Sequence, residues 1–158
     1  MRILFAVLML SIAAIGFATE ALVSLDTVIH GSDRIVRGRV VSLNCRRGTN
    51  DFGDDLIYTD ISIETHETLM GDRSNLLLTI EGGTVNGITL KVSDVPEFHP
   101  GDEVLVFTKK EGASNFLSFG SQSKYSISTS GRIRENGVYY GDFKKNVMEI
   151  VSGKRGGL

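Results

Sequence analysis

The sequence contains one cysteine, no tryptophan and only two prolines in 158 residues. A single cysteine excludes an intramolecular disulfide, so burial of apolar surface must hold the fold together. We expect Cys45 to be a small apolar filler at the end of a strand, with a reactive thiol or an intermolecular bridge as the alternatives. Pro96 and Pro100 both fall in one segment, which is predicted to be a loop between strands.

The chain also lacks an excess of positive charge: 17 basic and 19 acidic residues give a formal net charge of −2. Binding to bulk nucleic acid requires clustered Lys and Arg, so this function class is disfavoured. Five arginines do lie close together, but no aromatic residue for base stacking lies among them, and nearby aspartates offer them partners. These arginines are Arg34, Arg37, Arg39, Arg46 and Arg47.

The only long apolar run is at the amino terminus. Arg2 precedes an apolar stretch over residues 3–17, and small residues at positions 16 and 18 suit a signal peptidase. We therefore predict a cleaved signal peptide at residues 1–18, since the run is too short for an ordinary membrane span. We expect export to the periplasm or the medium, with no stable membrane insertion after cleavage. Residues 19–152 then form a single domain, and residues 153–158 a frayed tail.

Apolar and polar residues alternate through most of the remaining chain, which is typical of β-strands. Residues 103–108 are apolar on both faces and therefore predict a central strand. Helical spacing predicts short helices at residues 24–30 and 142–151, the second capped by Asp142. The polar, glycine-containing residues 44–55 predict a long loop, and residues 93–101 a second loop. Further strands are predicted at residues 33–43, 56–70, 75–81, 84–92, 116–120 and 124–128, with a last hairpin at 131–140.

This pattern predicts a mainly β protein: a small closed OB-like antiparallel barrel with a short N-terminal helix and a C-terminal helix. Residues 24–41, 58–71, 81–87 and 98–107, the last ending His-Pro-Gly-Asp-Glu-Val-Leu-Val-Phe, resemble a group of small exported bacterial proteins. More remotely, the order of elements is similar to the netrin-like module of tissue inhibitors of metalloproteinases, which is an OB-type barrel. Those inhibitors use an amino-terminal cysteine and disulfides, which this chain lacks, so their mechanism does not carry over.

Two patterns could support metal chemistry. Asp51, Asp54 and Asp55 place carboxylate oxygens close together in the predicted loop, but without the spacing of an EF-hand. His66 shares a predicted strand face with Glu64, and such a pair could bind a metal or orient a general base. Ordinary solvent-exposed side chains account for both patterns. A metal-assisted hydrolase using His66, Glu64 and the loop at residues 51–55 is therefore the alternative function, and no cofactor is expected.

Neither a Gly-x-Ser-x-Gly elbow nor a His-Glu-x-x-His motif is present in the sequence, so we do not expect an enzyme. We expect a monomeric, exported, non-catalytic binding module whose partner is another exported protein. A structural protein of the cell envelope is a third possibility. The partner would dock near the two predicted loops, for which the candidate residues are Arg46, Arg47, Phe52, Phe98 and His99.

Overall fold

The computed structural model describes residues 22–156, so the predicted signal peptide lies outside the described residues. The protein is mainly β with one helix near each end of the described chain, as the sequence predicts. In chain order the elements are α1 (Leu25–His30), β1 (Arg34–Thr49), β2 (Asp55–Met70), β3 (Leu76–Glu81), β4 (Gly83–Val85), β5 (Ile88–Leu90), β6 (Glu103–Glu111), β7 (Ser114–Leu117), the 3-10 helix η1 (Gly120–Ser123), β8 (Lys124–Ile127) and α2 (Tyr140–Gly156).

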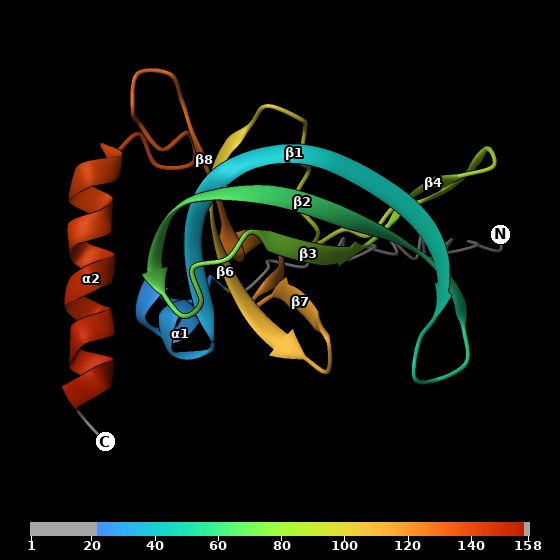
Figure 1. Cartoon of the computed structure of the whole chain (residues 1–158), viewed down its shortest axis with the longest axis horizontal. Coiled ribbons are helices and arrows are strands. Elements are labelled where there is room, and N and C mark those ends of the chain that lie inside the picture. The colour runs from blue at the N-terminus through green and yellow to red at the C-terminus, as the bar shows by residue number, and fades with distance from the viewer. Residues whose placement is uncertain (1–21, 157–158) are drawn as a thin grey trace, which may run out of the picture.

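The strand pairings of the larger sheet run round in a ring. β1 pairs with β2, β2 with β3, β3 with β7, β7 with β6, and β6 again with β1. All of these pairs are antiparallel except β3–β7, which is parallel and is joined at the single pair Leu78–Asn115. In Figure 1, β1 and β2 arch over the other strands, and α2 stands to one side of them. β8 extends the sheet beside β6.

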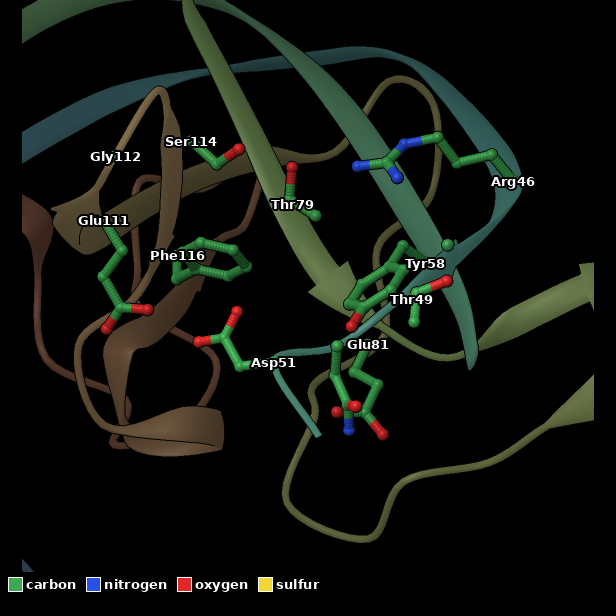
Figure 2. A pocket seen from close by; sticks show the side chains of 12 residues that line it. Arg46, Thr49, Asp51, Tyr58, Thr79, Glu81, Glu111, Gly112, Ser114 and Phe116 are labelled. Carbon is green, nitrogen blue, oxygen red and sulfur yellow. The ribbon is translucent and has the colours of Figure 1, made fainter. Parts of the chain in front are cut away.

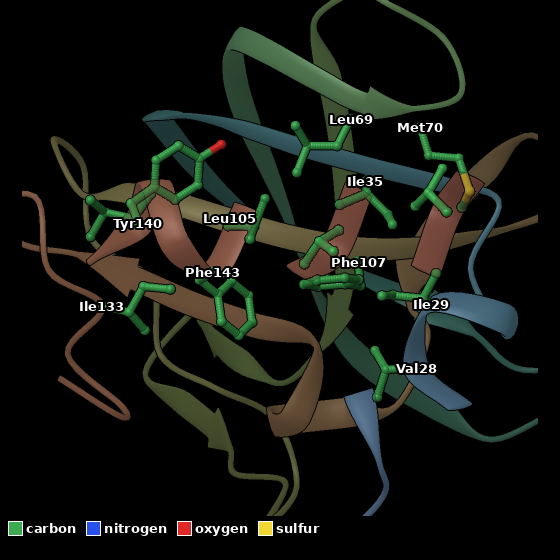
Figure 3. Packing of buried hydrophobic residues seen from close by; sticks show 13 residues of the cluster. Val28, Ile29, Ile35, Leu69, Met70, Leu105, Phe107, Ile133, Tyr140 and Phe143 are labelled. Atoms are coloured by element: carbon green, nitrogen blue, oxygen red, sulfur yellow. The ribbon is translucent and has the colours of Figure 1, made fainter. Parts of the chain in front are cut away.

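The strand β6 lies between two hydrophobic clusters, which explains why it is apolar on both faces. Side chains alternate across a strand, so Val104 and Val106 join the cluster formed with β2 and β3. Leu105 and Phe107 join a second cluster, formed with α1 and α2 (Figure 3). All four side chains are fully buried. The prediction of a central, doubly covered strand is confirmed.

The long loop predicted at residues 44–55 is wrong. β1 continues to Thr49 and β2 begins at Asp55, so only residues 50–54 form the turn. This end of the two strands is polar because much of it is exposed to solvent, and charged pairs hold it across the strands. Arg46 forms an ion pair with Asp60 and Arg47 forms one with Asp55, each diagonally across the strands, with nitrogen–oxygen distances of 2.6 and 2.5 Å.

The single strand predicted at residues 84–92 is also wrong. β4 and β5 form a small hairpin that turns at Asn86 and Gly87, whose φ angles are +51° and +77°. An Asn-Gly pair with positive φ at both residues is the preferred turn of a two-residue hairpin. This hairpin projects from the side of the molecule away from α2 (Figure 1).

Both predicted helices are present, although α2 is longer than predicted. Ser24 caps α1, since its hydroxyl accepts a hydrogen bond from the Thr27 amide at 3.2 Å. α2 begins at Tyr140, so Asp142 lies in its first turn instead of capping it, and the helix continues to Gly156. The preceding segment forms a loop closed by the bridge Arg132–Tyr139, where a full hairpin had been predicted. No helix within residues 22–156 is long and apolar enough to cross a membrane.

Candidate functional site

A groove of about 600 Å³ lies between the tip of the β1–β2 hairpin, the end of β3 and the β6–β7 hairpin. These three parts come from distant regions of the chain (Figure 2). The lining residues are mostly polar and include two aromatic rings and three carboxylates. They are Arg46, Gly48, Thr49, Asn50, Asp51, Tyr58, Thr79, Glu81, Glu111, Gly112, Ser114 and Phe116.

The hairpin tip that forms one wall is held rigidly by Asn50. Its side-chain oxygen accepts hydrogen bonds from the amides of Phe52 and Asp54 at 3.0 and 2.9 Å. Its side-chain nitrogen donates to the Asp54 carboxylate at 2.9 Å. Gly53 has a φ of +87°, which a residue with a side chain rarely adopts. The tip therefore places Asp51 at the groove in a defined position.

A second wall is built on Asp60, which joins β1, β2 and β3. Arg46 donates to this carboxylate through Nε at 2.6 Å and through Nη2 at 3.3 Å. Thr79 donates to it at 2.8 Å. The hydrogen bond from Arg46 is the main reason that the pKa of Asp60 lies below its usual range, and the same bond raises the pKa of Arg46. The Arg46 guanidinium also lies 5.4 Å from the centre of the Tyr58 ring. Arg46 is thus already paired, and its charge is not free for a ligand.

The remaining charges of the groove are negative. Asp51, Glu81 and Glu111 line it, and Glu111 also contacts Lys109 at 2.5 Å. In Figure 2, Asp51 lies between the rings of Phe116 and Tyr58, with Glu111 beside Phe116 and Glu81 beside Tyr58. The arrangement offers carboxylates for a cation and flat apolar surfaces for its carbon chain.

The structure brings only some of the predicted site residues to the groove. Arg46 and Asp51 line it, while Arg47 pairs with Asp55 beside it. Phe52 is 91% exposed at the hairpin tip. Phe98 is 5% exposed and belongs to a hydrophobic core cluster, so it is not available for docking as predicted. It is buried because the proline-containing segment folds its aromatic ring against the strands.

The other predicted residues lie elsewhere. His99 is exposed and its Nδ1 lies 3.4 Å from Asp102. His66 lies 3.2 Å from Glu103 and 3.9 Å from Glu64. It is separated from Asp55 by 11 residues of β2, and strand geometry places these two positions roughly 35 Å apart along the chain. The structure therefore brings His66 and Glu64 together, but it does not bring them to the loop at residues 51–55.

The described part of the chain contains no cluster of side chains that could bind a metal ion. Within residues 22–156, no group of three or more His, Cys, Asp or Glu side chains is arranged to hold a metal ion. Asp54 is hydrogen-bonded to Asn50, and Asp55 is paired with Arg47. Cys45 is half-buried, with its sulfur 3.3 Å from the Thr59 hydroxyl oxygen.

Sequence reasoning missed Glu81, Glu111 and Phe116 as site residues. The polar face of β2 carries Tyr58 and Asp60 and was visible from the alternation alone. The missing signal is the pairing of β3 with β7, which brings the β6–β7 hairpin to this face.

No known family model matches the chain, and no curated protein shows significant sequence similarity to it.

Proposed function

We propose that this protein is an exported, non-catalytic binding module with an OB-like barrel. The ring of strand pairings supports the barrel, since strands β1, β2, β3, β7 and β6 succeed one another around it with one parallel contact. OB-type barrels bind ligands on the face of their second and third strands, between two loops. The groove occupies the corresponding place here, on β2 and β3 between the β1–β2 and β6–β7 hairpins.

The ligand that fits this groove is an extended polypeptide segment that carries a lysine or arginine. The observation that carries this proposal is the sign of the charge. Three carboxylates line the groove, of which Glu111 also contacts Lys109, and the one arginine there is paired with Asp60. Opposite charge favours binding and speeds the encounter of the two partners. Tyr58 and Phe116 supply surface for the aliphatic part of a basic side chain.

A binding role suits the side chains of the groove better than catalysis. Neither a histidine nor a cysteine is among the lining residues that the structure describes. General acid–base chemistry near neutral pH is most often carried by histidine. Asp60 and Arg46 form a fixed pair that holds three strands together, so we assign them a role in shaping the groove.

Defined peptides test the proposal directly. Fluorescence polarisation would compare short labelled peptides that differ at one central position, which is lysine, arginine, glutamine or glutamate. We expect the lysine and arginine peptides to bind and the glutamate peptide not to bind. Glu81→Gln should weaken binding of the lysine peptide about tenfold, because one charge-assisted contact is lost.

Glu149→Gln is the matched control, because it makes the same change at an exposed position of α2 far along the chain. This variant should bind the lysine peptide like the wild type. Equal binding of the lysine and glutamine peptides would contradict the proposal. An equal loss in both variants would show an effect of net charge alone and would also contradict it.

Export has its own test. We propose cleavage after Ala18, so amino-terminal sequencing of the secreted or periplasmic form should begin at Thr19. Protein that stays in the cytoplasmic fraction with Met1 intact would refute export. Tight fractionation with membranes or cell wall would favour the envelope structural role instead.

A further inference from the structure

A second cavity, of about 340 Å³, lies on a different part of the surface and carries the opposite charge. It is bounded by β1, by the start of β6, and by β8 with the loop that follows it. It shares no lining residue with the groove described above. Its lining residues are Arg37, Arg39, Gly101, Asp102, Glu103, Ser126, Ile127, Ser128, Thr129, Gly131 and Arg134.

Two of the three arginines come from the same face of β1, because positions 37 and 39 are two residues apart on one strand. Arg37 donates through Nε to Glu103 at 2.8 Å, and its guanidinium lies 4.7 Å from the centre of the Tyr140 ring. These two contacts fix its orientation. Arg39 is 59% exposed and its Nε lies 4.0 Å from Glu103, so its guanidinium is only loosely held.

The third arginine, Arg134, comes from the loop that follows β8 and is exposed. It forms no ion pair with any residue in the described range 22–156. Ser128 and Thr129 also line the cavity, but the Ser128 hydroxyl already donates to the Arg132 carbonyl oxygen at 2.9 Å. The three arginines and the Thr129 hydroxyl that line this cavity therefore come from two separate parts of the chain.

The carboxylates around the cavity are largely occupied. Glu103 is shared between Arg37, Arg39 and His66. Asp102 accepts a hydrogen bond from the His99 amide at 3.1 Å. Three arginines against these two carboxylates leave the lining with an excess of one positive charge.

Three further carboxylates lie nearby. Glu64 faces Arg39 across the β1–β2 pair and lies 3.9 Å from His66. Both oxygens of the Glu135 carboxylate accept from the Ser126 amide at 2.9 Å. Glu67, which faces Arg37 across the β1–β2 pair, accepts from Tyr140 and Lys144. None of these three carboxylates lines the cavity, so the lining itself keeps an excess of one positive charge for a bound anion.

We propose that this cavity binds a phosphate or sulfate group. The planar guanidinium of arginine matches two oxygens of such a group at once, and the Thr129 hydroxyl can donate to another. The small volume suits one oxyanion on a small molecule or a headgroup. The cavity would thus give the protein a second ligand, of opposite charge to the one proposed for the groove.

The test uses inorganic phosphate as the probe. Amide chemical shifts of the nitrogen-15-labelled protein would be followed during titration with sodium phosphate at fixed pH, with sodium chloride keeping the ionic strength constant. We expect saturable shifts at the amides of Gly101, Ser128 and Gly131. Arg134→Gln should weaken the affinity about tenfold, because it removes charge-assisted hydrogen bonds to the anion.

Arg73→Gln is the matched control, since Arg73 is exposed between β2 and β3 and does not line the cavity. It makes the same change in charge and should leave the affinity unchanged. Shifts that never saturate, or an equal loss in both variants, would show general screening of surface charge and overturn the proposal.

A second measurement distinguishes two sources of the anion. The protein would be sedimented with vesicles of phosphatidylcholine alone or mixed with phosphatidylglycerol. Sedimentation with the mixed vesicles that Arg134→Gln abolishes would support the site and assign it to a lipid headgroup. Saturable phosphate binding without vesicle binding would support the site and assign it to a soluble phosphate compound. Failure of both measurements would overturn it.

Discussion

The hydroxyl of Tyr140 donates a 2.7 Å hydrogen bond to the carboxylate of Glu67, which ties the first residue of α2 to β2. Burial is the main cause that raises the pKa of Tyr140, and the bond to Glu67 raises it further, so the hydroxyl keeps its proton. Burial alone would raise the pKa of Glu67, but hydrogen bonds from Lys144 and Tyr140 outweigh it, and the pKa is lowered. This contact fixes where α2 lies against the sheet.

We expect Tyr140→Phe to lower the free energy of unfolding by about 1–2 kcal/mol, because a hydrogen bond to a charged group is lost without loss of the ring. Urea denaturation followed by circular dichroism measures this change. Tyr139→Phe is the matched control: Tyr139 is 50% exposed, and its ring would still stack with Arg132 at 3.8 Å. Equal stability of the two variants would show that the Tyr140–Glu67 bond contributes nothing.

Stability should fall in acid. The pKa values of Glu67 and Asp60 are both lowered in the folded protein, so the unfolded chain binds protons more readily. Their contribution is present above the unfolded pKa values, about 4.3 for Glu and 3.9 for Asp, and is lost as pH falls through the lower folded values. Urea denaturation from pH 7 down to about pH 3 would measure this loss. The double variant Glu67→Gln/Asp60→Asn should show a shallower decline, and a decline as steep as that of the wild type would refute the assignment.

Gly38→Ala should destabilise the protein strongly. A Cβ atom there would lie 2.2 Å from the Glu64 carbonyl oxygen and 2.8 Å from an Ile63 side-chain carbon. Relieving such overlap requires β1 and β2 to separate, and we expect a cost of about 3 kcal/mol in unfolding free energy.

Gly141→Ala is the comparison for this substitution. A Cβ atom at position 141 would meet nothing within 4 Å, and the residue lies in the first turn of α2. Alanine is favoured over glycine in a helix, so we expect a gain of about 0.5–1 kcal/mol. Thermal and urea denaturation of both variants would measure the contrast. A tolerated alanine at position 38 would contradict the close approach of the two strands.

Phe98→Ala and Phe52→Ala should differ greatly in stability. Phe98 is 5% exposed within a core cluster, and its removal should cost about 3–5 kcal/mol. Phe52 is 91% exposed, so its removal should change stability by less than about 0.5 kcal/mol. Urea denaturation of the two variants compares them on one scale. Similar losses would mean that the hairpin tip packs against the body of the protein in solution.

The sequence was enough to predict the strands in which apolar residues either alternate with polar ones or occupy both faces. β6 is apolar on both faces and the first half of β2 alternates, and both strands were predicted from these features. The last six residues of β1, 44–49, were missed because they carry polar and charged side chains such as Asn44 and Arg47, which also suit a loop. The β4–β5 hairpin was missed although Asn86 and Gly87 are a strong turn signal, because β-branched residues on both sides suggested one strand.

The candidate site was less predictable than the fold. Asp60 and Tyr58 share the polar face of one strand, which the alternation shows. Glu111 and Phe116 reach the groove only because Asn115 pairs with Leu78, a contact between residues far apart in sequence. Local spacing carries no information about such a contact, so these two residues could not be assigned to the site.

The pairing of β1 with β6 also determines the order in which this chain can fold. It joins Arg34 to Thr108 and Arg39 to Glu103, across 64 to 74 residues, whereas β1 and β2 are neighbours in sequence. Closing so long a loop costs entropy before any contact compensates for it, so distant pairings form slowly. The β1–β2 hairpin can therefore form early, while the ring stays open until β6 has been synthesised. A nascent chain that ends before residue 103 has no partner for this edge of β1, so its sheet cannot yet close into the ring.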